Sequence, residues 1–138
     1  MDGDVFNDMV AATIDLRAHM NGLRFGPPTA FVYNPLEYAW TAHEQYLRLA
    51  ASDKKKVVFL GMNPGPFGMV QTSVPFGEVT AVKDWIGVDA PIGKPDKEHP
   101  KRPVEGLACA RSEVSGLPSC CNTLSISAAA RAMSEQVI

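Results

Sequence analysis

The chain has 138 residues, of which 46% are apolar and 20% charged, so it suits one small globular domain rather than a disordered chain. Its net charge of −2 excludes a globally basic nucleic-acid-binding protein, and any cationic surface must be local. No apolar run reaches the length of a membrane span, the first residues lack the basic start of a signal peptide, and three cysteines without metal-ligand spacing fit a reducing compartment.

The first predicted element is an amphipathic helix over residues 6–20. Apolar residues recur there at helical spacing, and Asn21-Gly22 supplies a stop signal. The stripe expected to face the core consists of Met9, Ala12, Leu16, Met20 and Leu23. After a Gly-Pro-Pro linker, residues 30–33 are expected to form a short strand or an extended segment.

A second helix is predicted to begin at Asn34, which has an N-capping side chain and precedes Pro35, a favourable first helical residue. Its buried stripe is expected to comprise Tyr38, Ala42, Tyr46 and Leu49. His19 on the first helix and His43 on the second show no partner pattern, so both are expected at the surface. The β-branched run at residues 57–60 then predicts a buried strand.

Two loops bounded by Gly and Pro follow this strand, at residues 61–69 and 71–79, and the second carries Phe76 at its tip. Because α/β sheets carry their sites at the carboxyl ends of strands, these loops predict a pocket for a flat ligand. A third helix is predicted over residues 79–86, and residues 91–103, rich in Pro and Lys, are expected to be irregular. The alternation of helix and strand predicts an α/β fold with a parallel sheet.

The loop residues also carry a resemblance. Gly61-Met62-Asn63-Pro64-Gly65-Pro66-Phe67-Gly68-Met69, followed by Val74-Pro75-Phe76-Gly77-Glu78-Val79, resembles the first active-site motif of the single-strand-selective monofunctional uracil-DNA glycosylases. The match extends upstream through residues 33–40 and downstream through residues 98–104 and 112–116.

This resemblance implies a partial uracil-DNA-glycosylase-like parallel sheet with flanking helices. Residues 1–116 would be the N-terminal half of such a domain, with the C-terminal half missing. Residues 117–138 resemble nothing in the family, and we expect an unrelated tail that is disordered or weakly helical.

Cleavage of an N-glycosidic bond in DNA requires a flipped base, a positioned water and stabilisation of charge on the departing base. The resemblance assigns the water to Asn63, whose neutral amide offers both donors and an acceptor. It assigns base stacking to Phe76, and lining of the base pocket to Met62 and to backbone groups near Phe67. Gly65 is expected to allow a positive φ or a close approach of DNA. The alternatives from residue type alone are a turn role for Asn63 and core packing for Met62 and Phe76.

A local basic segment contains His99, Lys101 and Arg102, side chains suited to contacts with DNA phosphates. A solvated loop is the alternative, because Asp96 and Glu98 dilute its charge. The sequence shows no metal-ligand constellation and no phosphate-binding loop ending in Lys and Ser or Thr, so we expect neither a metal nor a cofactor.

The family's second catalytic motif, a His-Pro-Ser segment, has no counterpart here, and no histidine follows His99. The family function is removal of uracil and related modified pyrimidines from single- and double-stranded DNA in base-excision repair, and we expect it to be impaired in this chain. The first alternative is a truncated, inactive product with weak nucleic-acid binding. The second is an α/β module that binds a small molecule. The resemblance implies DNA as the partner, a monomeric state and a nuclear location.

Overall fold

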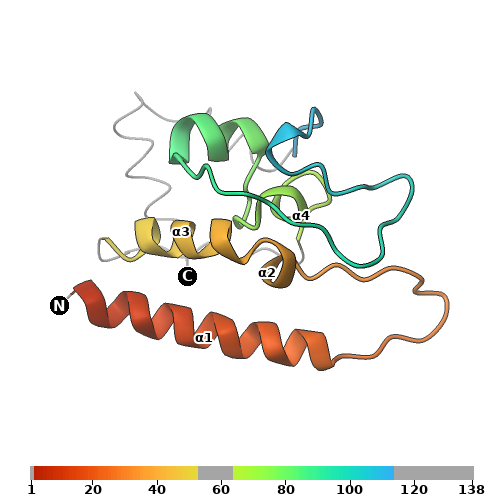
Figure 1. The fold of residues 1–138 in the computed structure, drawn as a ribbon, viewed down its shortest axis with the longest axis horizontal. Coiled ribbons are helices and arrows are strands. Elements are labelled where there is room, and N and C mark those ends of the chain that lie inside the picture. Colours follow the sequence, from red (N-terminus) through yellow and green to blue (C-terminus); the bar gives the residue numbers. More distant parts are fainter. Residues whose placement is uncertain (1, 53–63, 114–138) are drawn as a thin grey trace.

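The computed structural model describes residues 2–52 and 64–113, with side chains described from residue 5 onward. The elements are α1 (Asp2–Gly22), α2 (Pro35–Tyr38), α3 (Trp40–Ala50), α4 (Met69–Thr72), the π-helical turn η1 (Ala81–Ile86) and the 3₁₀ turn η2 (Gly106–Ala108). A long loop joins α1 to α2, and α1 lies along α2 and α3 with the opposite chain direction (Figure 1). The short helix α4 contacts α2 and η2, on the side of α2 and α3 away from α1 (Figure 1).

The predicted parallel sheet is not seen among the described residues. The central strand expected at residues 57–60 lies outside them, so the sheet stays a prediction. Residues 30–33 form neither a strand nor a helix, and Phe31 and Val32 are exposed, so the predicted strand is not found there. The tail predicted at residues 117–138 also lies outside the described residues.

The predicted start of the second helix is confirmed. The Leu36 amide donates to Asn34 Oδ1 over 3.2 Å, and Pro35 occupies the first helical position. The helix is interrupted at Ala39, whose φ of −124° separates α2 from α3. The prediction that Leu49 belongs to the buried stripe is wrong, because Leu49 is exposed. The core cluster instead contains Ala42, Tyr46, Leu47, Ala50, Val74, Val82, Val88 and Ala90.

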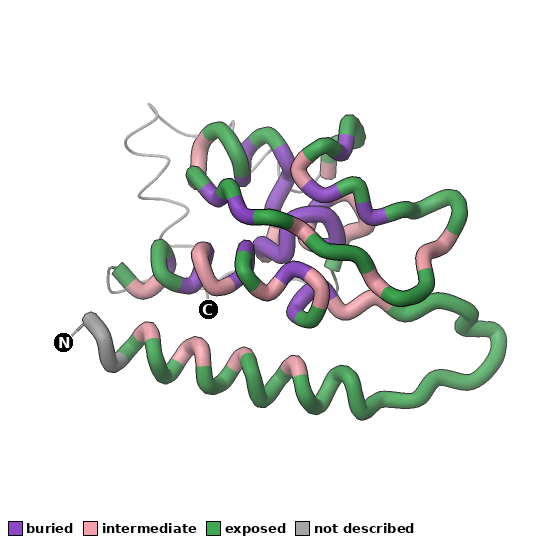
Figure 2. Tube along the Cα trace, in the orientation of Figure 1, coloured by how far each residue is buried: buried purple, intermediate pink, exposed green. Residues whose placement is uncertain are grey.

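The first helix exists as predicted, but its inward face is rotated from the predicted stripe. Leu16, Met20 and Leu23 are exposed, whereas the half-buried positions are Phe6, Met9, Val10, Thr13 and Arg17. Phe6, Met9 and Val10 pack against the core cluster, and two cations on aromatic rings add to this contact. The Arg17 guanidinium lies 4.9 Å from the Trp40 ring centroid, and that of Arg48 lies 4.4 Å from the ring of Phe6. Apolar spacing alone therefore does not predict which side of α1 faces the core, because Arg17 is part of that side. Most of α1 is exposed to solvent (Figure 2).

The third helix is confirmed over residues 79–86. The buried Glu78 carboxylate accepts from the Ala81 amide over 2.8 Å, which caps the helical stretch that begins at Val79 and continues into η1. Gly87 ends the helix with a φ of +80°, a conformation that favours glycine. Residues 91–103 contain no helix, as expected, and their one ladder contact is an isolated bridge between His99 and Arg102.

Candidate functional site

We call the segment that carries the family motif, residues 61–79, the motif loop, and the structure describes it from Pro64 onward. The Gly65 carbonyl accepts from the amides of Gly68 and Val70, over 3.3 and 3.0 Å, and this turn leads directly into α4. Asn63 and Met62, the predicted water-holding and base-lining residues, lie outside the described residues. Their roles stay predictions, but the position of Pro64 shows where the segment that carries Asn63 enters the described structure.

Two side-chain hydrogen bonds join α4 and Ser73, the residue after it, to α2. The Tyr38 hydroxyl donates to the Val70 carbonyl over 2.6 Å. The Ser73 hydroxyl donates to the Pro35 carbonyl over 3.1 Å. The residues that resemble the family upstream, around Tyr38, thus fix the position of the motif loop.

His43 also binds this loop, and its predicted surface position is wrong. It is only 5% exposed, and its Nδ1 lies 2.6 Å from the Ser73 carbonyl oxygen. Since a carbonyl can only accept, Nδ1 carries the proton. Burial lowers the pKa of the His43 imidazole, so the ring is held in its neutral form.

Phe76 lies in the turn that follows. It is half-buried and has a φ of +53°, a left-handed conformation rare for a bulky residue. The turn is closed by the Gly77 amide, which donates to the Val74 carbonyl over 2.9 Å, and by the buried Thr72 hydroxyl, 3.1 Å from the Gly77 carbonyl. Strained residues of this kind gather at functional sites, and the turn gives Phe76 a defined position.

Gln71 is a residue that sequence reasoning missed. Its side-chain amide is buried and fully used: Nε2 donates to the carbonyls of Pro66 and Pro103, each over 3.0 Å. Its Oε1 accepts from the amides of Glu105 and Gly106, over 2.7 and 3.0 Å. Gln71 therefore joins the motif loop to the chain that follows the basic segment. No local pattern in the sequence signals these contacts, because three of the four Gln71 partners lie 32 to 35 residues away in the chain.

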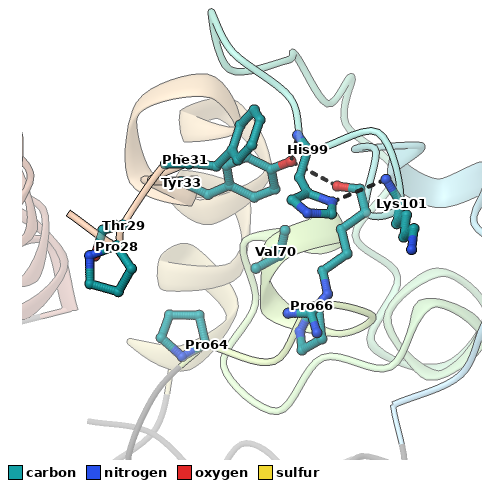
Figure 3. Close-up of a pocket in the computed structure, with 11 residues that line it drawn as sticks. Pro28, Thr29, Phe31, Tyr33, Pro64, Pro66, Val70, His99 and Lys101 are labelled. Carbon is teal, nitrogen blue, oxygen red and sulfur yellow. Dashed lines mark hydrogen bonds between the residues drawn. The ribbon is translucent and has the colours of Figure 1, made fainter.

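A hollow of about 640 Å³ lies between the motif loop and the basic segment. This size is in the range of small-molecule sites. Its lining residues are Pro28, Thr29, Ala30, Phe31, Tyr33, Pro64, Pro66, Val70, His99, Lys101 and Arg102 (Figure 3). The hollow thus brings the predicted DNA contacts together with the neighbour of Asn63.

Three other predicted site residues do not line this hollow: Gly65, Phe67 and Phe76. The Arg111 guanidinium covers the Phe67 ring, 4.9 Å from its centroid. Gly65 does not have a left-handed φ, so the expectation that this position needs glycine for a positive φ is wrong. A close approach does occur there, because a Cβ on Gly65 would overlap the carboxylate of Glu113.

Tyr33 fixes the shape of the basic segment. Its hydroxyl accepts from the His99 amide over 2.6 Å and donates to the Arg102 carbonyl over 2.8 Å. The Arg102 amide donates to the His99 carbonyl, and the Lys101 amide donates to His99 Nδ1 over 3.0 Å. The segment is therefore an ordered turn, and Lys101 and Arg102 are carried on a backbone that these hydrogen bonds fix; Figure 3 shows Lys101 beside His99.

The charge on this turn is available for an anion. Among the residues the structure describes, no carboxylate lies within ion-pair distance of the Lys101 or Arg102 side chain. Glu98 is engaged elsewhere, accepting from the Val104 amide over 2.9 Å and lying 3.7 Å from the Lys94 ammonium. The local charge therefore favours phosphate, in spite of the acidic net charge of the chain.

The described residues hold no group of three or more side chains arranged to bind a metal ion. In the same part of the chain, no helix has the length and apolar character that a membrane span requires.

Comparison with known proteins finds no matching family profile. Curated relatives do match, among them the following three. The "Single-strand selective monofunctional uracil DNA glycosylase" of Mus musculus is 55% identical over 101 residues, which are 73% of this chain and 36% of the relative. The proteins of that description from Rattus norvegicus and Bos taurus are each 54% identical over 101 residues, 73% of this chain and 36% and 37% of theirs.

The matched part of the chain therefore belongs with the uracil-DNA glycosylases. Within that class, its relatives are the single-strand selective monofunctional glycosylases, and the family inferred from the loop motifs is confirmed. The match spans little more than a third of the length of these relatives.

Proposed function

We propose that the chain acts on uracil-containing DNA as a uracil-DNA glycosylase of base-excision repair. The observation that carries this proposal is the hollow in which Pro64, the residue after Asn63, faces the cationic turn of Lys101 and Arg102. A DNA strand held at this turn by its phosphates would present a nucleotide to the motif loop. The names of the relatives support uracil as the target base.

The proposed reaction is hydrolysis without a metal or a covalent intermediate. Water held by the Asn63 amide adds its oxygen to the sugar carbon, and the N-glycosidic bond breaks. The electron pair of that bond leaves with the base, and the proton that the water loses ends on the departed base. Phe76 stacks on the flipped base, and Met62 with the backbone near Phe67 lines the pocket. Stacking contributes about 1–3 kcal/mol per base, which offsets part of the cost of flipping. Gly65 keeps the loop close to its neighbours.

A second candidate function is DNA binding without excision. The observation that favours it is that only one of the three histidines lies at the hollow, with one of its ring nitrogens already engaged. His43 is buried and bonded to Ser73, His19 is exposed on α1, and no histidine follows His99 in the sequence. His99 is the one histidine at the hollow, and its Nδ1 accepts from the Lys101 amide. Loss of one transition-state donor lowers a rate by about 10²–10³-fold.

Formation of abasic sites in a uracil-containing strand separates the two functions. A catalytic chain produces strands that alkali cleaves at the uracil, and Asn63→Ala abolishes this. Asn7→Ala, an exposed asparagine on α1, is the matched control and should leave the rate unchanged. Binding to the strand without any Asn63-dependent cleavage would support the second function and contradict the first.

Four further features are part of the proposal. Residues 57–60 supply the central strand of a parallel sheet that the helices flank, residues 117–138 form a separate tail, the chain is a monomer, and it works in the nucleus. The family of the relatives supports the sheet, because that family suggests an α/β fold. Backbone chemical shifts of residues 57–60, sedimentation of the chain and imaging of a tagged copy test these features.

A further inference from the structure

Phe31 is an aromatic side chain that the proposed reaction does not use. It lies in the loop between α1 and α2, and 37% of its surface is exposed. Its ring packs edge to face with the His99 imidazole, with centroids 5.0 Å apart and an angle of 72° between the planes. The ring is therefore held in place from one side while a large part of it remains open to solvent (Figure 3).

Cations flank Phe31 on both sides. Phe31 lines the hollow of about 640 Å³ together with Lys101 and Arg102. It also lines a neighbouring hollow of about 480 Å³ that contains Lys94 and Lys97. The second hollow carries Asp96 and Glu37 as well, so its positive charge is weaker. The aromatic ring thus lies on the wall between two sites that bear lysine or arginine.

An exposed aromatic ring between cations is the arrangement that binds single-stranded nucleic acid. Phosphates follow the positive charges, and an unpaired base stacks on the ring. A base in a duplex has both faces covered by its neighbours and cannot stack in this way. The ordered turn held by Tyr33 keeps Lys101 and Arg102 at a fixed place relative to His99, and hence to the Phe31 ring.

We propose that Phe31 is a stacking platform for an unpaired base of DNA next to the nucleotide that enters the motif loop. Lys101 and Arg102 contact the phosphate on one side of that base, and Lys97 approaches the phosphate on the other, because Lys94 is paired with Glu98. This inference rests on the proposed action on DNA and adds a second base-binding position outside the catalytic motif.

The test measures binding of uracil-free oligonucleotides by fluorescence anisotropy, so excision plays no part. Phe31→Ala should weaken binding to single-stranded oligothymidine about tenfold, the loss expected for one stacked base. It should not weaken binding to an abasic strand of the same length, which has phosphates but no bases, or to a duplex. Phe31→Trp should retain the affinity for oligothymidine. Phe25→Ala is the matched control, because Phe25 is exposed in the same loop and lies outside both hollows.

The charges are tested through the salt dependence of binding. Each phosphate contact that is lost should reduce the slope of log affinity against log salt by about 0.7 for a single strand. We expect this for Lys101→Gln and for Arg102→Gln, and no change for Lys83→Gln on η1, an exposed lysine away from both hollows.

Several results would overturn the inference. They are an unchanged affinity of Phe31→Ala for oligothymidine, an equal loss on the abasic strand, and no binding by the unmodified chain. Binding that depends on Phe31 in a chain that releases no uracil would keep this inference and contradict the proposed excision. Uracil release by a chain whose DNA affinity does not depend on Phe31 would support the proposed excision and contradict this inference.

Discussion

The Nδ1–H group of His43 donates to the carbonyl of Ser73 over 2.6 Å, across 30 positions of the chain. Ser73 has a φ of +59° and directly follows α4, so this bond joins α3 to the strained end of the motif loop. The imidazole is buried and makes this bond while neutral. The position of the loop therefore depends on a titratable group.

We expect the chain to lose stability in mild acid because of His43. Burial lowers the pKa of this imidazole in the folded state below its usual value of about 6.5, so the unfolded state takes up the proton first. The stabilisation is complete above about pH 6.5, and below it the free energy of unfolding falls by up to about 1.4 kcal/mol per pH unit. Urea unfolding between pH 8 and 5 measures this.

The control for this prediction compares two histidines. His43→Gln should remove the fall that begins near pH 6.5, whereas His19→Gln, at an exposed position on α1, should keep it. An identical pH dependence in both variants would contradict a buried neutral His43.

Gln71→Glu should destabilise the fold by about 3 kcal/mol. A carboxylate oxygen would replace the amide nitrogen that now donates to the carbonyls of Pro66 and Pro103, leaving two acceptors unpaired beside a buried charge. The DNA affinity should fall too, because Gln71 joins the loop to the chain after Arg102. Gln45→Glu, which loses one long exposed bond of 3.4 Å to Gly87, should change the stability by less than about 0.5 kcal/mol. Equal losses in the two variants, measured by urea unfolding, would refute this role of Gln71.

Two tyrosines should respond in opposite directions to replacement by phenylalanine. Burial raises the pKa of both phenols, so both stay neutral. The Tyr46 hydroxyl is buried, and no described residue offers it a hydrogen-bond partner, so Tyr46→Phe should stabilise the chain by about 1 kcal/mol. The Tyr38 hydroxyl donates to Val70 over 2.6 Å, so Tyr38→Phe should destabilise it by about 1 kcal/mol or more. Thermal unfolding of both variants checks the signs, and a loss of stability in Tyr46→Phe would be contrary to the structure.

Gly77→Ala should disturb the turn that carries Phe76. A Cβ there would lie 2.6 Å from Thr72 Oγ1 and 2.7 Å from both the Cβ and the carbonyl oxygen of Val74. Overpacking of this kind costs about 1–3 kcal/mol. Gly22→Ala is the control, since no atom lies within 4 Å of its added Cβ. Calorimetry should show a lower melting temperature for the first variant alone, and a Gly77→Ala protein as stable as the unmodified chain would show that the turn is looser than described.

Elements with local signals could be predicted from the sequence. Asn34 and Pro35 mark the start of α2, and Gly87 marks the end of η1, because caps act through neighbouring backbone groups. The motif residues also indicated the family, which the relatives confirm. Asn63 and Met62 lie outside the described residues, so their roles remain predictions.

Features that depend on distant partners could not be predicted. His43 finds its acceptor 30 residues away, and Gln71 finds Glu105 34 residues away. The inward face of α1 contains Arg17 on the ring of Trp40 beside Phe6, Met9 and Val10, so the predicted apolar stripe identified only part of it. The hollow likewise joins Phe31 to Lys101 across a separation that no local pattern reveals.

The central claim is excision of uracil, and the most direct measurement is the single-turnover rate of uracil release from a single-stranded oligonucleotide with one uracil. Purified chain is used in excess, its fold is checked by circular dichroism, and the released base is detected by mass spectrometry. We predict release by the unmodified chain and by Asn7→Ala, and none by Asn63→Ala. A folded chain that releases no uracil, or an Asn63→Ala variant that releases it at the unmodified rate, would contradict the account.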